Sequence, residues 1–133
     1  MYKNITITLG GREFSGVELN GVKLLNATPH PIKFVDGDSL VELPTSGLVV
    51  SAKAETIDAG EFGGAKLVKT RFNGDNEMAA LLDEAKDHGI IVVGSIIAVN
   101  AYPGKVYGLV PAPGFERVPP AEKRFLADTF NVA

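Results

Sequence analysis

The chain has 133 residues, of which 45% are hydrophobic and 22% are charged, and it contains no cysteine. This length and mix fit one globular domain, and the lack of cysteine excludes a disulfide framework or a thiolate metal site. A formal net charge of −3 disfavours a nucleic-acid polymer as partner, because proteins that bind such polymers neutralise many phosphates at once. No apolar stretch is long enough for a bilayer and no signal peptide is visible, so a cytoplasmic location is expected.

The first half of the chain is predicted to consist of strands. Gly10-Gly11 interrupts an alternation of apolar and polar residues, which predicts an N-terminal hairpin within residues 1–22. The two prolines of the segment 26–31 (N-A-T-P-H-P) hold it extended, because each fixes φ and removes a backbone donor. Asp36-Gly37-Asp38 and the glycine-rich segment 60–64 are predicted connections between strands. The expected strands cover residues 5–9, 14–19, 22–25, 32–35, 40–43, 48–57 and 66–72.

One internal helix is predicted from four apolar residues that share a face at helical spacing. They are Met78, Leu81, Leu82 and Ala85. Asp75 or Asn76 suits the N-cap of this helix, and His88-Gly89 suits its end.

The rest of the second half alternates between strand and helix signals. The apolar run 90–99 predicts a central strand buried on both faces and ending at Asn100, and a short strand follows over 106–110. Residues 119–131 are predicted to form a short C-terminal helix, with Pro120 in its first turn. The whole chain, residues 1–133, is therefore predicted to be a single compact α+β domain with a mostly antiparallel or mixed sheet.

Signatures of catalysis are scarce. His30 and His88 are the only histidines, and neither has carboxylates at the spacing of a metal site. The sequence has no nucleophile elbow, Walker loop or dinucleotide-binding glycine motif. We therefore expect no metal, no cofactor and no enzymatic activity, and the simpler interpretation of His30 is a turn residue.

Ligand binding has better candidates at the end of the predicted central strand. The amide of Asn100 can donate and accept hydrogen bonds, which suits an adenine edge or a ribose hydroxyl. Tyr102 could stack on a base. The alternative is that Asn100 only caps the turn before Pro103-Gly104.

Two arginines are candidates for anion binding. Arg117 follows a glycine turn, from which a guanidinium can clamp phosphate oxygens, although a surface pair with a neighbouring glutamate is the alternative. Arg71 and Lys69 share one face of a predicted strand, which is either an anion contact or a solvated face. Thr45-Ser46-Gly47 could form an anion-binding nest, or simply a turn that links strands.

Several segments of the chain resemble, in the same order, a group of small phage proteins that includes the first type of Thoeris anti-defence protein. These segments are 24–32, 43–47, 100–103, 110–114 and Arg117. The resemblance covers roughly Lys23 to Arg117, and its most specific part is the block N-A-T-P-H-P-I.

The resemblance implies a molecular sponge. Such proteins bind cyclic ADP-ribose isomers made by bacterial Thoeris enzymes without degrading them, and so keep the downstream effector silent. The resemblance also implies dimers that assemble into hexamers, ligand pockets at dimer interfaces and, in some members, binding of cyclic trinucleotides of the CBASS system. The expected location is then the cytoplasm of the bacterial host.

The resemblance also implies roles for individual residues. Asn100 matches a pocket asparagine and Arg117 a phosphate-contacting arginine, while Arg71 matches a further arginine although the loop lengths between it and Asn100 differ. The base-stacking aromatic of the family has no counterpart just before Asn100. The candidates for that role are Phe72, Tyr102 and Phe115.

Two other functions remain open at this stage. One is a hydrolase of ADP-ribose derivatives, with His30 and Asp36 in acid–base roles. The other is a structural or assembly component of a phage particle, which would bind no small molecule.

Overall fold

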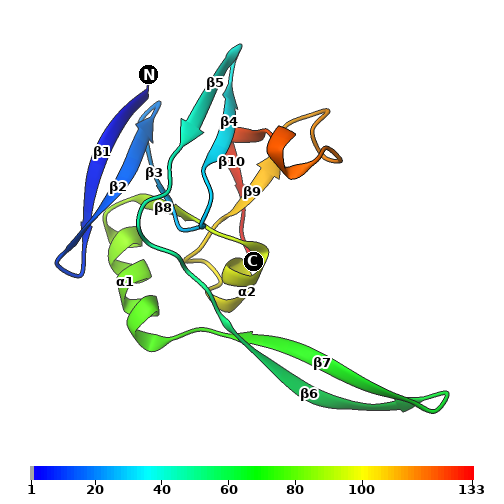
Figure 1. Ribbon diagram of the computed structural model, residues 1–133. Helices are drawn as coiled ribbons and strands as arrows, with labels where there is room; N and C mark the ends of the chain where they lie inside the picture. The colour runs from blue at the N-terminus through cyan, green and yellow to red at the C-terminus, as the bar shows by residue number, and fades with distance from the viewer. Residues whose placement is uncertain (1) are drawn as a thin grey trace.

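Two four-stranded sheets packed face to face form the body of the molecule in the computed structural model, which describes residues 2–133 (Figure 1). In spatial order the first sheet consists of β1 (Tyr2–Leu9), β2 (Arg12–Leu19), β3 (Val22–Asn26) and β8 (Ile90–Val93). In the same order the second sheet consists of β5 (Ser39–Leu43), β4 (Ile32–Asp36), β10 (Phe125–Asn131) and β9 (Gly108–Pro111).

Two helices, α1 (Asn76–Asp87) and α2 (Ile96–Ala101), pack on the outer face of the first sheet. The structure confirms α1 as the predicted internal helix. Asp75 is its N-cap and accepts a hydrogen bond from the backbone N–H of Glu77 at 3.4 Å. Leu82 and Ala85 are fully buried against the sheet, which is the role that their spacing predicted.

The first sheet is buried on both faces because its strands alternate between two cores. On one face Phe14, Leu25 and Val92 pack with the helices. On the other face side chains such as Val17 and Leu24 pack against the second sheet. A strand that is covered on both faces needs apolar residues at consecutive positions, which explains why all four residues of β8 are isoleucine or valine.

The third β element is a two-stranded antiparallel ribbon of β6 (Lys53–Phe62) and β7 (Ala65–Asn73), called the arm below. The arm extends away from the body of the molecule (Figure 1). At its tip Gly63 and Gly64 have φ angles of 59° and 82°, the left-handed conformation that a tight two-residue hairpin turn requires.

The described residues thus have the predicted α+β fold, with ten strands and two α-helices. The N-terminal hairpin and the strands on either side of Gly37 are confirmed, while two predicted strands are displaced along the chain. The predicted strand 48–57 begins only at Lys53 and runs on to Phe62, and the predicted strand 106–110 covers Gly108–Pro111. Within residues 2–133 neither helix has the length and apolar content that crossing a membrane requires.

The prediction of one strand over residues 90–99 is wrong. β8 ends at Val93, and Gly94-Ser95 separates it from α2. The Ser95 hydroxyl accepts a hydrogen bond from the backbone N–H of Ala98 at 3.2 Å, so it starts a helix where the sequence suggested a buried strand. Asn100 therefore lies on a helix and not at the carboxyl end of a strand.

The prediction of a C-terminal helix over residues 119–131 is also wrong. Only Pro120–Glu122 forms a 3-10 turn, and Phe125–Asn131 is strand β10. β10 pairs in parallel with β4 and antiparallel with β9, so it satisfies backbone groups on both neighbouring edges. Phe125 and Phe130 pack into the core between the sheets, and this tertiary burial outweighs a weak local helix signal.

Candidate functional site

A groove beside α2, here called the Asn100 groove, is the candidate site. It has a volume of about 550 Å³ and lies between α2, β9, the start of β10 and the residues that follow β10. Its apolar walls come from Ile96, Val99, Leu109, Phe125 and Val132. This volume is within the range of small-ligand sites, which are typically apolar with a few fixed polar groups.

Four polar side chains line the groove, and two of them are already used by the fold. Ser95 caps α2, and the Asn131 amide donates to the carbonyl oxygen of Leu109 at 3.2 Å. The side chains of Asn100 and Lys123 have no hydrogen-bond or ion-pair partner within residues 2–133. One amide and one ammonium group therefore remain for a ligand.

Lys123 is a residue that the sequence analysis did not single out. It was expected inside a C-terminal helix, whereas it stands just before β10 and joins the groove because β10 inserts between β4 and β9. No spacing in the sequence links Lys123 with Asn100, since the two are brought together only by strand pairing.

Arg71 and Phe72 lie on β7 of the arm and do not line the Asn100 groove. The guanidinium of Arg71 forms an ion pair with Glu55 on β6 at 3.2 Å, and Asn73 donates to the same carboxylate at 2.7 Å. These contacts lower the pKa of Glu55 below its usual value. The hydrogen bond from Asn73 contributes most, and the hydrogen bond and charge of Arg71 contribute less. The Arg71 side chain thus links the two strands of the arm in this structure.

Tyr102 lies immediately after α2 and is almost completely buried, with 4% of its surface exposed. Its hydroxyl oxygen accepts a hydrogen bond from the backbone N–H of Asp75 at 2.7 Å. Its ring lies so close to Gly74 that a Cβ there would be 2.6 Å from a ring carbon. Tyr102 therefore anchors the junction between the arm and α1, and its ring faces are not free for stacking on a base.

Phe115 and Arg117 lie in the loop that follows β9. The Arg124 guanidinium stands over the Phe115 ring at 6.0 Å from its centroid, which is a cation–π contact. Arg117 is exposed to solvent. The six residues singled out in the sequence thus lie in four places: the arm, α2, the buried position just after α2, and the loop after β9. Asn100 is the one of them that lines the groove.

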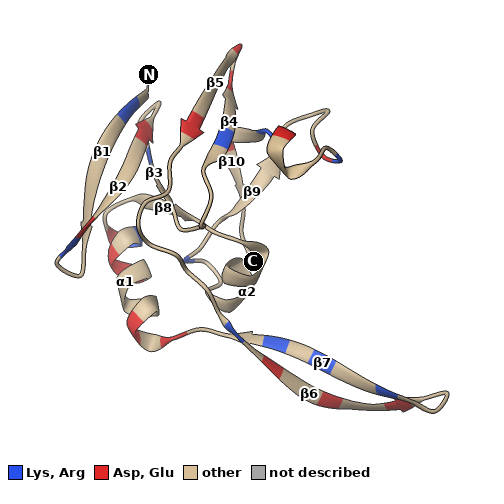
Figure 2. Cartoon of the chain, viewed as in Figure 1, with Lys and Arg blue, Asp and Glu red and all other residues tan. Residues whose placement is uncertain are grey.

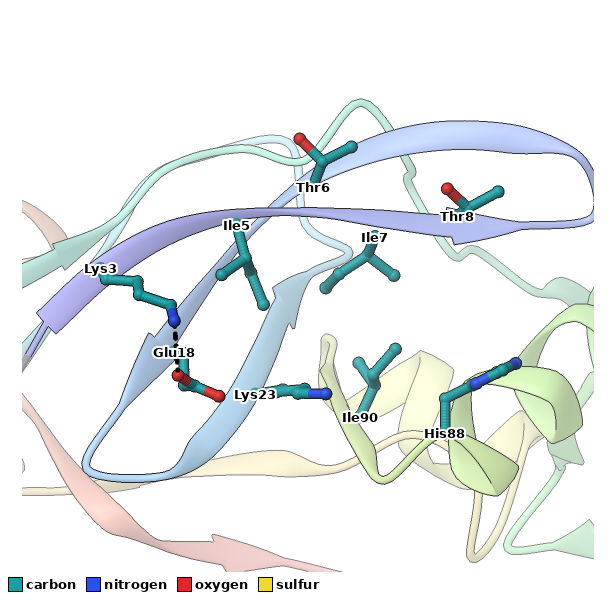
Figure 3. A pocket seen from close by; sticks show the side chains of 9 residues that line it. All are labelled: Lys3, Ile5, Thr6, Ile7, Thr8, Glu18, Lys23, His88 and Ile90. Carbon is teal, nitrogen blue, oxygen red and sulfur yellow. Dashed lines mark ion pairs between the residues drawn. The ribbon is translucent and has the colours of Figure 1, made fainter.

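A second hollow lies between β1 and the segment that leads from α1 into β8 (Figure 3). Single residues of β2 and β3 also line it. Lys3, Glu18 and Lys23 occupy one row across β1, β2 and β3, and Lys3 is paired with Glu18 at 3.4 Å. Lys23 lies along the floor toward Ile90, while the His88 side chain points away from it (Figure 3). Glu18 pairs with Lys3, so Lys23 is the remaining cation of this hollow, which makes it a second candidate for an anionic ligand.

The two residues of the hydrolase hypothesis differ in their surroundings. Asp36 accepts a hydrogen bond from the Asn20 amide at 3.2 Å. His30 is exposed, and its backbone carbonyl accepts a hydrogen bond from the Asn26 amide at 2.7 Å. Ser46 is buried, and its hydroxyl donates to the carbonyl of Asn26 at 2.6 Å, so segment 45–47 is a linking turn. Among residues 2–133, no three His, Cys, Asp or Glu side chains gather closely enough to hold a metal ion.

Comparisons of the chain with protein-family models, with curated proteins and with solved structures find no match in any of the three.

Proposed function

We propose that the chain binds a small nucleotide of the cyclic ADP-ribose class in the Asn100 groove and holds it without chemical change. In this proposal it is a phage protein that withdraws an immune signal inside the bacterial host. The ligand class comes from the sequence resemblance. The structure supports the binding role.

The observation that carries the proposal is the set of side chains that line the groove. The set contains no histidine, aspartate, glutamate, cysteine or tyrosine, which are the usual proton-transfer groups and nucleophiles. Its only hydroxyl, that of Ser95, is engaged as a helix cap, and the remaining polar groups are two amides and one ammonium. Such a site can recognise a ligand but has little with which to transform it.

Each free group of the groove suits one part of a cyclic dinucleotide-sized ligand. Lys123 carries a positive charge for a phosphate oxygen, while the Asn100 amide can donate to and accept from a base edge or a ribose. The apolar wall, with Phe125, Val99 and Leu109, offers a surface for a base. The oligomers that the resemblance implies would enclose such a ligand further.

The proposal is tested by mixing the purified protein with cyclic ADP-ribose isomers, removing the protein by filtration and then heating the protein fraction. We expect the ligand to be depleted from the filtrate and to be released intact by heat. Release of a converted product would make the chain an enzyme, as in the hydrolase hypothesis. No depletion of any isomer or cyclic trinucleotide would contradict the proposed ligand class.

Two substitutions test the position of the site. Asn100→Ala should weaken binding about tenfold, because it removes one neutral hydrogen-bonding group. Lys123→Ala should weaken it about 10- to 100-fold, because hydrogen bonds to charged groups contribute more. Titration calorimetry with cyclic ADP-ribose gives both values.

The matched controls are Asn4→Ala on β1 and Lys23→Ala on β3, which remove the same chemical groups outside the Asn100 groove. Both should bind like the unaltered chain. If Lys23→Ala weakens binding and Lys123→Ala does not, the ligand occupies the hollow of Figure 3 instead. If Arg117→Ala weakens binding and Lys123→Ala does not, the cation implied by the resemblance is the correct one.

A further inference from the structure

A further hollow lies at the end of the second sheet where β4 begins and β5 ends, and it is here called the His30 hollow. Its volume is about 490 Å³, which is within the range of small-ligand sites. Three parts of the chain line it: the start of β4 with the residues that precede it, the end of β5, and the stretch from the 3-10 turn into β10.

Three side chains of this hollow can donate hydrogen bonds to an anion. Lys33 and Lys123 each bring an ammonium group, and His30 brings a ring N–H. In the part of the chain that the structure describes, none of these three side chains has a hydrogen-bond or ion-pair partner. Because free donors from separate segments line one hollow, the site suits a group with several acceptor oxygens, such as a phosphate.

An acceptor lies beside these donors. The carboxylate of Glu42 lines the same hollow, and the register of β4 and β5 sets Glu42 opposite Lys33. Figure 2 shows the blue of β4 beside the red of β5. Two ammonium groups against one carboxylate leave the hollow positive, but Glu42 repels an anion that fills all of it. The charges therefore favour a ligand with an anionic end and a second part that donates hydrogen bonds, as a hydroxyl group does.

The remaining walls of the hollow are apolar. Pro31, Pro120 and Ala121 are exposed, and Phe125 is half-buried. Proline rings are rigid, and an aromatic ring offers a large apolar surface. Such walls suit the C–H face of a sugar ring, whose hydroxyl groups remain free to reach Glu42.

We propose that the His30 hollow binds a sugar phosphate with a terminal phosphate group. The phosphate accepts hydrogen bonds from Lys33, Lys123 and His30, and a sugar hydroxyl donates to Glu42. A terminal phosphate has three acceptor oxygens, one for each donor, and a charge of about −1.5 to −2 at neutral pH. The site is distinct from the Asn100 groove, although Lys123 and Phe125 line both.

Titration calorimetry of the full chain with glucose 6-phosphate and ribose 5-phosphate tests the proposal. We expect at least one of them to bind about tenfold more tightly than inorganic phosphate, because inorganic phosphate cannot use Glu42 or the apolar walls. Lys33→Ala should weaken that binding about 10- to 100-fold, since it removes a charged hydrogen-bond donor. Lys66→Ala on the arm is the matched control and should bind like the unaltered chain.

A substitution of Glu42 has a different expected effect on the two kinds of probe. Glu42→Gln removes the charge that repels a bare anion and weakens the acceptor for the sugar hydroxyl. Inorganic phosphate should therefore bind about threefold more tightly and the sugar phosphate about threefold more weakly, measured by the same titration. Damage to the fold would weaken both probes, so the opposite signs report the role of Glu42 in the site.

Three results would overturn this site. They are no binding of either sugar phosphate at millimolar concentration, equal affinity for sugar phosphate and inorganic phosphate, and binding that Asn100→Ala weakens while Lys33→Ala does not. The last result would place the sugar phosphate in the Asn100 groove. Neither probe is a cyclic nucleotide, so failure here leaves the proposed function standing, and failure of the filtration experiment leaves this site standing. Circular dichroism of each variant confirms that its fold is kept, since Lys33 and Glu42 lie outside both cores.

Discussion

Replacing Asn26 by alanine is expected to lower the free energy of unfolding by about 3 kcal/mol. Asn26 is completely buried, and its amide nitrogen donates to the carbonyl of His30 at 2.7 Å. Its side-chain oxygen accepts hydrogen bonds from the backbone N–H of Thr28 at 2.9 Å and from the Thr28 hydroxyl at 2.6 Å. Removing the amide leaves these groups with fewer partners, and each unsatisfied buried group costs about 1–3 kcal/mol.

Urea unfolding followed by circular dichroism measures this change. A loss of about 3 kcal/mol is a large part of the roughly 5–15 kcal/mol that stabilise a domain. Asn4→Ala is the control, because Asn4 is exposed on β1 and should change stability by less than about 0.5 kcal/mol. A similarly small effect of Asn26→Ala would mean that water replaces the lost amide and that the hydrogen bonds of Asn26 do not stabilise the fold.

The position of Asn26 gives the segment N-A-T-P-H-P a structural role. β3 belongs to the first sheet and β4 to the second, so the chain passes between the layers in this segment. The Asn26 side chain fixes this corner, and the Ser46 hydroxyl holds the Asn26 carbonyl at 2.6 Å. The most specific block of the sequence resemblance therefore serves the fold, and it lies outside the Asn100 groove.

Replacing Tyr102 by alanine is expected to lower the free energy of unfolding by about 3–5 kcal/mol, the usual cost of deleting a buried aromatic ring. The deletion also removes the acceptor for the Asp75 N–H and the surface against which Gly74 packs. We expect the root of the arm to loosen as a result. Thermal unfolding and hydrogen exchange at residues 73–76 measure both effects.

Tyr102→Phe is the matched variant, because it keeps the ring and removes only the hydroxyl. It should cost about 1 kcal/mol, the usual value of one hydrogen bond. Both variants should still bind the ligand at temperatures where they are folded, since Tyr102 does not line the Asn100 groove. Loss of binding with little change in stability would instead identify Tyr102 as the base-stacking aromatic.

Local sequence signals were enough to predict the elements that are stabilised by interactions between residues close in the chain. α1 follows from an N-cap, four apolar residues at helical spacing and a terminal His88-Gly89, all within 15 residues of one another. The N-terminal hairpin follows from alternation around Gly10-Gly11, where φ angles of 58° and 76° favour glycine. The α+β class could therefore be predicted without long-range information.

The remaining elements depend on partners that are distant in the chain. β10 is a strand because β4 and β9 present two open edges and because Phe125 and Phe130 gain burial between the sheets. The Asn100 groove likewise depends on residues that are distant in the chain. The sequence identified Asn100 as a candidate from its residue type and from a predicted place at the end of a strand, and that place is wrong. The tertiary structure joined Asn100 to Lys123 and separated it from Arg71, Tyr102 and Arg117. Short-range patterns encode capping, turns and periodicity, whereas a groove is formed by strand pairing between distant segments, which no single stretch of the sequence specifies.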